Sequence, residues 1–123
     1  MARILSVEDD PDYQYQVSHA LRNETWEVHY AFTGPEGYEK AVSLNPDIIL
    51  MDLRLPLLNG VEVIKRLKQN KATKDIPVIV LTNHSADAGF VESGVKALGV
   101  VAYLNKPAPM DELCALIKRL LNG

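Results

Sequence analysis

The sequence predicts an α/β fold, a doubly wound parallel sheet of five strands in five strand–helix repeats. Two observations support this fold class. Short apolar runs recur at intervals of roughly 20 to 30 residues, the spacing that a strand–helix repeat requires. Three of these runs are almost continuously apolar, which is typical of strands buried on both faces beneath helices.

The five apolar runs are the predicted strands, at residues 4–7, 28–31, 48–51, 78–81 and 100–104. Helix signals lie between them. Asp10 is placed as the N-cap of the first helix, with Pro11 at the first helical position. Thr33 and Glu36 have the capping-box spacing for the second helix, and the Asn-Pro pair at 45–46 ends it.

The third helix is predicted to begin after Asn59, with Glu62 in its first turn. A fourth helix is expected over residues 86–98, ended by Gly99, and two internal glycines lower its local stability. Pro109 begins the last helix. Its apolar stripe consists of Leu113, Leu116, Ile117 and Leu120.

Length and charge limit the possible functions. The chain has 123 residues, 13 Lys+Arg against 16 Asp+Glu, and a net charge of −3, so we expect one domain over residues 1–123. A mildly acidic chain without a basic cluster argues against nucleic-acid binding. No apolar run is long enough to span a bilayer. A single cysteine fits a reducing compartment, so a cytoplasmic location is expected.

Polar residues follow the predicted strands, and in parallel α/β sheets ligands bind at this edge. These residues are Glu8, Asp9 and Asp10 after the first strand, Asp52 after the third, Thr82, Asn83 and His84 after the fourth, and Asn105 and Lys106 after the fifth. Converging carboxylates repel one another unless a cation lies among them. An all-oxygen donor set favours a hard ion, and Mg²⁺ suits it best because no EF-hand loop is present.

Lys106 and Thr82 add a positive charge and a hydroxyl, which can both contact an anion held beside the metal. A carboxylate, a Mg²⁺ site, a lysine and a hydroxyl together indicate a phosphoryl-transfer site in which an Asp is the nucleophile.

Four segments in order along the chain carry a family resemblance: residues 3–10, 47–56 with Gly60, 78–82, and 103–107. In these segments the sequence resembles the response regulator receiver domain family, of which the chemotaxis response regulator is a single-domain member. The resemblance covers essentially the whole chain. It implies the flavodoxin-like strand order 2-1-3-4-5.

The resemblance also implies roles for the acidic residues. Asp52 resembles the aspartate that is phosphorylated. Glu8 and Asp9 resemble the acidic pair that holds Mg²⁺, with Asp9 as the direct ligand. Asp52 is the further carboxylate of the implied Mg²⁺ site. The backbone carbonyl of Arg54 resembles the remaining protein ligand.

Further residues resemble the switch of the family. Thr82 resembles the hydroxyl residue that moves toward the phosphoryl group, Lys106 the lysine that pairs with it, and Tyr103 the aromatic residue whose rotamer reports activation. The chain departs from the family pattern after the threonine, where Asn83 replaces a small residue. His84 and Arg54 then flank the approach of water, and we expect a long-lived phosphoryl group.

The function implied is that of a phosphorylation-controlled signalling module and not of an enzyme beyond its own phosphorylation and dephosphorylation. A histidine kinase or a histidine phosphotransfer protein donates the phosphoryl group. An output protein then binds the face formed by the fourth helix, the fifth strand and the last helix. Both a stand-alone receiver and the N-terminal part of a longer regulator are compatible with this interpretation.

Two other classes of protein share part of this pattern. A Mg²⁺-dependent phosphohydrolase of the haloacid dehalogenase type also uses an Asp nucleophile, but it needs an acid two residues later, where this chain has Arg54. A flavin-binding flavodoxin needs a phosphate loop after the first strand, where this chain has only acids. Multiple turnovers with a small phosphodonor would favour the phosphohydrolase.

Overall fold

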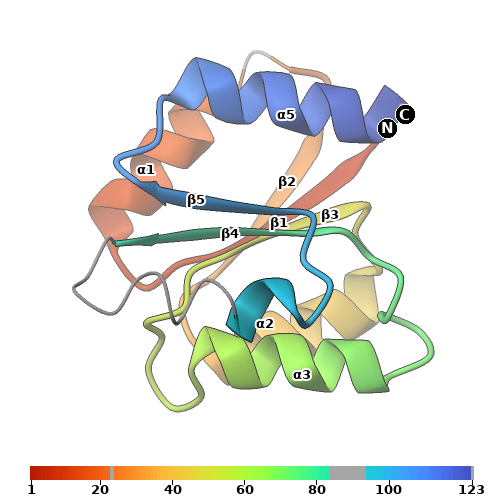
Figure 1. Ribbon diagram of the computed structural model, residues 1–123. Helices are drawn as coiled ribbons and strands as arrows, with labels where there is room; N and C mark the ends of the chain where they lie inside the picture. The colour runs from red at the N-terminus through yellow and green to blue at the C-terminus, as the bar shows by residue number, and fades with distance from the viewer. Residues whose placement is uncertain (23, 84–93, 123) are drawn as a thin grey trace.

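The strands form one parallel sheet with the predicted order. The computed structural model describes residues 1–22, 24–83 and 94–122, and its sheet runs β2-β1-β3-β4-β5 (Figure 1). The strands are β1 (Arg3–Val7), β2 (Glu27–Ala31), β3 (Ile48–Met51), β4 (Val78–Asn83) and β5 (Ala102–Lys106). The predicted α/β class and the order 2-1-3-4-5 are confirmed.

Helices cover both faces of the sheet, so the fold is doubly wound (Figure 1). The helices described in full are α1 (Pro11–Leu21), α2 (Gly34–Leu44), α3 (Gly60–Gln69) and α5 (Met110–Asn122). α1 and α5 lie on one face, and α2 and α3 lie on the other. Among the described helices, none has the length and apolar character needed to cross a membrane.

Local sequence signals begin α1, α2 and α3 and end α2 where they were predicted to do so, while α5 begins at Met110, one residue after the predicted Pro109. The side chains of Asp10, Thr33 and Asn59 each accept a hydrogen bond from a backbone N–H of the first turn, at 2.9, 3.1 and 3.0 Å. Such a cap satisfies a donor that has no partner inside the helix. Asn45 ends α2 in the left-handed conformation, with φ of 48°.

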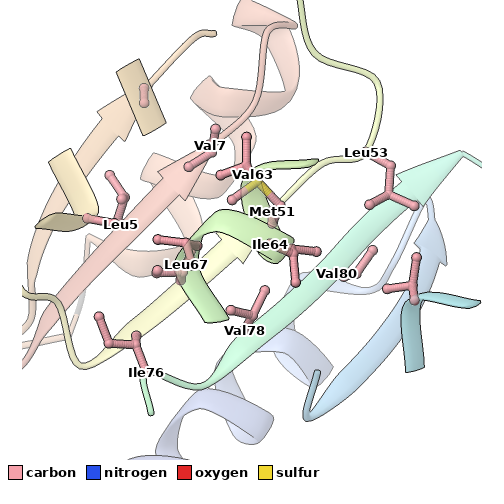
Figure 2. Packing of buried hydrophobic residues seen from close by; sticks show 14 residues of the cluster. Leu5, Val7, Met51, Leu53, Val63, Ile64, Leu67, Ile76, Val78 and Val80 are labelled. Atoms are coloured by element: carbon pink, nitrogen blue, oxygen red, sulfur yellow. The ribbon is translucent and has the colours of Figure 1, made fainter. Parts of the chain in front are cut away.

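Two buried clusters hold the helices on the sheet, one for each face. On the α2 and α3 face, side chains of α3 pack over β3 and β4, as Figure 2 shows for Val63, Ile64 and Leu67. On the other face, α1 and α5 contribute Val17, Leu21, Leu113 and Ile117. Each fully buried side chain of this size stabilises the fold by roughly 1.5–3 kcal/mol.

The fourth and fifth repeats differ from the prediction in detail. β4 extends to Asn83 and β5 occupies Ala102–Lys106, so both strands run farther than their apolar segments, because the ladder continues through Thr82 paired with Asn105. Of the predicted helix at 86–98, residues 84–93 lie outside the described part of the chain, and residues 94–96 are helical. Gly99 follows with φ of 87°, as a helix-ending glycine requires.

Close backbone approaches fix the loop between β3 and α3. A Cβ at Gly60 would lie 2.2 Å from the carbonyl oxygen of Asp52, and one at Gly34 would lie 1.9 Å from that of Leu58. Glycine is therefore required at both positions. At Gly37 the nearest atom would instead be Cγ1 of Val7, at 2.7 Å.

Candidate functional site

The candidate site lies at the carboxyl ends of β1, β3 and β5. Backbone hydrogen bonds continue the sheet just past the strand ends. The N–H of Glu8 donates to Ala31 O at 2.9 Å, and the N–H of Asp52 donates to Val7 O at 3.0 Å. These bonds carry Glu8 and Asp52 to the same edge on adjacent strands, as the strand-end argument predicts.

Within the described residues, three carboxylates converge at this edge. Glu8, Asp9 and Asp52 each offer an oxygen, and these oxygens lie within 4.8 Å of one another. Glu8 and Asp52 are buried, whereas Asp9 is exposed. Backbone donors orient the buried pair: the N–H of Leu53 donates to Asp52 Oδ1 at 2.8 Å, and the N–H of Asp10 donates to Glu8 Oε2 at 3.1 Å.

Lys106 brings a positive charge into this cluster. Its Nζ donates to Glu8 Oε1 and lies 3.6 Å from Asp52 Oδ2. The same Nζ lies over the ring of Tyr13, 4.2 Å from the ring centre. The side chain of Lys106 is only 8% exposed. The ammonium therefore pairs with Glu8 and stands beside Asp52 in a poorly solvated environment.

Burial shapes the ionisation of the site. It raises the pKa of Glu8 to about 7, and the negative charge of Asp52 adds to this shift, while hydrogen bonds from Lys106 and from the Asp10 N–H oppose it. Burial also raises the pKa of Tyr13 to about 12, together with the charges of Glu8 and Asp52. Without a bound cation, Glu8 therefore keeps its proton to a higher pH than an ordinary carboxyl group does.

The donor set fits a hard divalent cation. The cluster of Glu8, Asp9 and Asp52 supplies carboxylate oxygens only, which is the chemistry that Mg²⁺ prefers. A cation among them offsets the repulsion between Asp52 and Glu8 that raises the Glu8 pKa. The residues present therefore suit the predicted Mg²⁺ site.

A cavity of about 390 Å³ opens above the carboxylates. Arg54 and Asn83 line it together with the acidic cluster and Lys106. Both residues were predicted to lie at the approach to this site. Both side chains are exposed. His84, the other residue expected there, lies outside the described residues. The cavity is wide enough for a phosphoryl group and its water shell.

Thr82 and Tyr103 occupy the opposite face of the sheet from Lys106. Side chains alternate along a strand, and paired residues of neighbouring strands point to the same face. Tyr103 pairs with Val80 and packs, like Val80, on the α2 and α3 side. Thr82, two residues after Val80, shares that side and is buried. Asn83 and Lys106 therefore face α1 and α5.

Sequence reasoning missed two residues of α1 that support the site. Tyr13 lies under Lys106, and its place in an i, i+4, i+8 stripe with Val17 and Leu21 was the available signal. Gln14 is buried, and its Nε2 donates to the carbonyl oxygens of Ser6, Glu8 and Ala31 at 2.9, 3.3 and 3.1 Å. Nothing local in the sequence marks this glutamine as the bridge between α1, β1 and β2.

Comparison with known proteins agrees with this geometry. The response regulator receiver domain family matches residues 4–118. The chain belongs to this family. It is a receiver domain of a two-component system, and its acidic cluster is typical of the receiver metal site. Receiver domains partner with histidine kinases and are typically not true enzymes.

The relatives of this receiver domain include longer and equally short proteins. It is 37% identical over 123 residues to the DNA-binding dual master transcriptional regulator RpaA of Synechocystis sp., covering 98% of the chain and 49% of RpaA. It is 34% identical to Protein PilH of Pseudomonas aeruginosa, covering 100% of both chains. The chain thus spans about half the length of RpaA and all of PilH.

Solved structures resemble the receiver domain over its whole length. Chemotaxis protein CheY4 of Vibrio cholerae superposes with a TM-score of 0.87 at 29% identity, covering 98% of each chain. The receiver domain of a histidine kinase from Syntrophus aciditrophicus superposes with a TM-score of 0.89 at 29% identity, covering 100% of this chain and 92% of that one.

Proposed function

We propose that the protein is a phosphoacceptor that takes a phosphoryl group from a phosphohistidine onto Asp52. The observation that carries this proposal is the position of the Asp52 carboxylate, buried beside Glu8 and Asp9 and 3.6 Å from the Lys106 ammonium. A carboxylate among metal-binding oxygens and a lysine is arranged for phosphoryl transfer. The donor is a histidine kinase or a histidine phosphotransfer protein, and the exchange takes place in the cytoplasm.

In this transfer, an oxygen of Asp52 attacks the phosphorus atom of the donor. The new O–P bond forms as the P–N bond to the histidine breaks, and the imidazole nitrogen leaves with the electron pair. Asp52 must be ionised to act as the nucleophile. The hydrogen bond from the Leu53 N–H to Oδ1, at 2.8 Å, fixes the orientation of the carboxylate.

Glu8, Asp9, Asp52 and the backbone carbonyl of Arg54 would hold Mg²⁺ in this scheme. The ion would offset the negative charge that gathers on the phosphoryl oxygens. Lys106 already carries an ammonium into the cavity, and after transfer its hydrogen bond to Glu8 can be exchanged for one to a phosphoryl oxygen.

The output of the switch uses the other face of the sheet. Thr82 is proposed to turn toward the phosphoryl group, and Tyr103 to take the space it leaves; the two share one face on adjacent strands. The surface of the fourth helix, β5 and α5 then changes and binds an output protein. Of that helix, the described part is the turn at 94–96, where Val95 is buried against the α2 and α3 cluster.

The proposal is tested by incubating the protein with Mg²⁺ and phosphoramidate and mapping the product by mass spectrometry. We expect one acid-stable, base-labile adduct on Asp52, and none in Asp52→Asn. Asp47→Asn is the matched control, because Asp47 precedes the same strand and binds the Arg3 N–H far from the cavity. An adduct on Glu8 or Asp9, or repeated turnover of the donor, would contradict the phosphoacceptor role.

A further inference from the structure

Tyr13 occupies an unusual position beneath the ammonium of Lys106. The residue is only 8% exposed and belongs to the buried cluster of the α1 and α5 face. Its ring centre lies 4.2 Å from Lys106 Nζ, within the range of a cation–π contact. Because water is largely excluded from both side chains, this attraction is stronger than it would be at the surface.

Among the described residues, Lys106 contacts two carboxylates and one aromatic ring. Glu8 accepts its hydrogen bond and Asp52 stands 3.6 Å away, and both also belong to the carboxylate cluster suited to a metal ion. Of these three described neighbours, the Tyr13 ring carries no charge. A divalent cation that engages the carboxylates therefore weakens the hold of Glu8 and Asp52 on the ammonium and repels it, but leaves the ring contact intact.

We propose that Tyr13 is a positioning residue whose ring face keeps the Lys106 ammonium over the carboxylate cluster when a divalent cation occupies it. The part of this inference that concerns phosphorylation rests on the proposed function of Asp52. The part that concerns the place of Lys106 does not. In this scheme Lys106 is held where it can pass from Glu8 to an anion on Asp52.

The ring, and not the hydroxyl, performs this role. Within the described part of the chain, the buried Tyr13 hydroxyl has no hydrogen-bond partner. Its removal therefore costs no observed bond, and a phenylalanine ring offers the same face to a cation. Tyr13→Phe should thus behave as the wild type. Tyr13→Leu fills much of the same apolar space without an aromatic face.

The first measurement follows the ε-methylene protons of Lys106 by NMR during titration with Mg²⁺. These protons are expected upfield because of the aromatic ring current, and they should remain upfield at saturating Mg²⁺ in the wild type and in Tyr13→Phe. Loss of the upfield shift on Mg²⁺ binding in the wild type would overturn the proposal, because the ring would then fail to retain the ammonium.

The second measurement compares the rate of labelling by phosphoramidate with the Mg²⁺ dissociation constant. In Tyr13→Leu we expect the rate at saturating Mg²⁺ to fall about tenfold, and the dissociation constant to change less than about threefold. Tyr13→Phe should keep about the wild-type rate. Equal losses in the Phe and Leu variants, or a wild-type rate in the Leu variant, would contradict the positioning role.

Controls separate this inference from the proposed function and from folding defects. Tyr15→Leu changes an exposed tyrosine on the same helix and should leave both measurements unchanged. Tyr13→Met, with a flexible side chain that adapts to the core, replaces the Leu variant if circular dichroism shows that the latter unfolds. If the wild type is not labelled at all, the proposed function fails, and the NMR titration alone decides the role of Tyr13.

Discussion

The two ends of the sheet carry ion clusters of similar composition in different surroundings. At the carboxyl ends, the side chains of Lys106, Glu8 and Asp52 are 8%, 5% and 7% exposed. At the amino ends, Arg3 pairs with Glu27 at 2.9 Å, and the two are 48% and 43% exposed. Solvent exposure therefore decides which cluster contributes to the free energy of unfolding, because exposed charges are solvated whether or not they form an ion pair.

The directions of the two glutamate pKa shifts express this difference. Burial raises the pKa of Glu8, so its charge is unfavourable in the folded protein. The pKa of Glu27 is lowered, first by its hydrogen bond with His29 and then by the charges of Arg3 and His29, so its charge is favoured. The carboxyl end of the sheet, where the charge of Glu8 is unfavourable, therefore favours the binding of a cation. At the amino end, Arg3 and His29 already compensate the charge of Glu27.

The largest expected effect comes from removing the buried cation. Lys106→Met leaves Glu8 and Asp52 without their ammonium, and breaking a buried pair in this way costs about 3 kcal/mol. We expect this loss at pH 8 without Mg²⁺, measured by urea denaturation. Saturating Mg²⁺ should restore much of it. Arg3→Met, which breaks the exposed pair, is the matched control, and an equal loss there would remove the distinction between the two ends.

The pH dependence of stability should distinguish the two ends next. The folded-state pKa of Glu8 is about 7 against an ordinary value of 4.5. Its favourable contribution is thus complete below about pH 4.5 and is lost as the pH rises through about 7, a change of about 3 kcal/mol. Glu8→Gln should lack this decline in urea denaturation without metal. A decline of the same size in Glu8→Gln would assign it to another group.

Mg²⁺ affinity should depend strongly on Asp9. Asp9→Asn removes one ligand charge from the cluster, and we expect about tenfold weaker binding or more by titration calorimetry. Asp10→Asn is the control, since Asn caps a helix as well as Asp, and Asp10 Oδ1 accepts the cap hydrogen bond from the Asp12 N–H. Equal affinities of the wild type and Asp9→Asn would show that Asp9 is not a ligand.

The smallest effect is expected at the amino ends. Glu27→Gln removes an exposed charge partner, so the melting temperature near pH 7 should stay within measurement error. Because the folded-state pKa of Glu27 is lowered, any stabilisation exists above its unfolded value and is lost as the pH falls through the folded one. A clear fall in the melting temperature of Glu27→Gln near neutral pH, abolished by high salt, would mean that this exposed ion pair also stabilises the fold.

The sequence allowed the repeat and the caps to be predicted because each depends on residues close together in the chain. Asp10 and Asn59, for example, cap helices through contacts within a few residues. The meeting of Glu8 with Asp52 also follows, because parallel strands end at one edge. The sequence does not show whether Lys106 forms its hydrogen bond with Glu8 or with Asp52. That depends on differences of about an ångström, and the order of the strands does not fix them.

The sequence also did not show which face of the sheet each predicted site residue occupies. Alternation along the strand separates Thr82 from Asn83, but it does not say which of the two lies on the α2 and α3 side. The face is set by register, and a shift of one residue would reverse it. Tyr13 was missed because a buried aromatic residue on a helix is ordinarily a core residue, and only its distance to Lys106 distinguishes it.

The glycines around the β3–α3 loop differ in whether a second mutation can compensate for their loss. An alanine at Gly37 would press on side-chain atoms of Val7, so a smaller residue at position 7 can make room for it. At Gly60 and Gly34 the obstacle is the main chain of Asp52 and Leu58. No substitution shortens a carbonyl group. Gly34 and Gly60, which flank the loop after Asp52, are therefore positions where no second side-chain change can compensate for a larger residue.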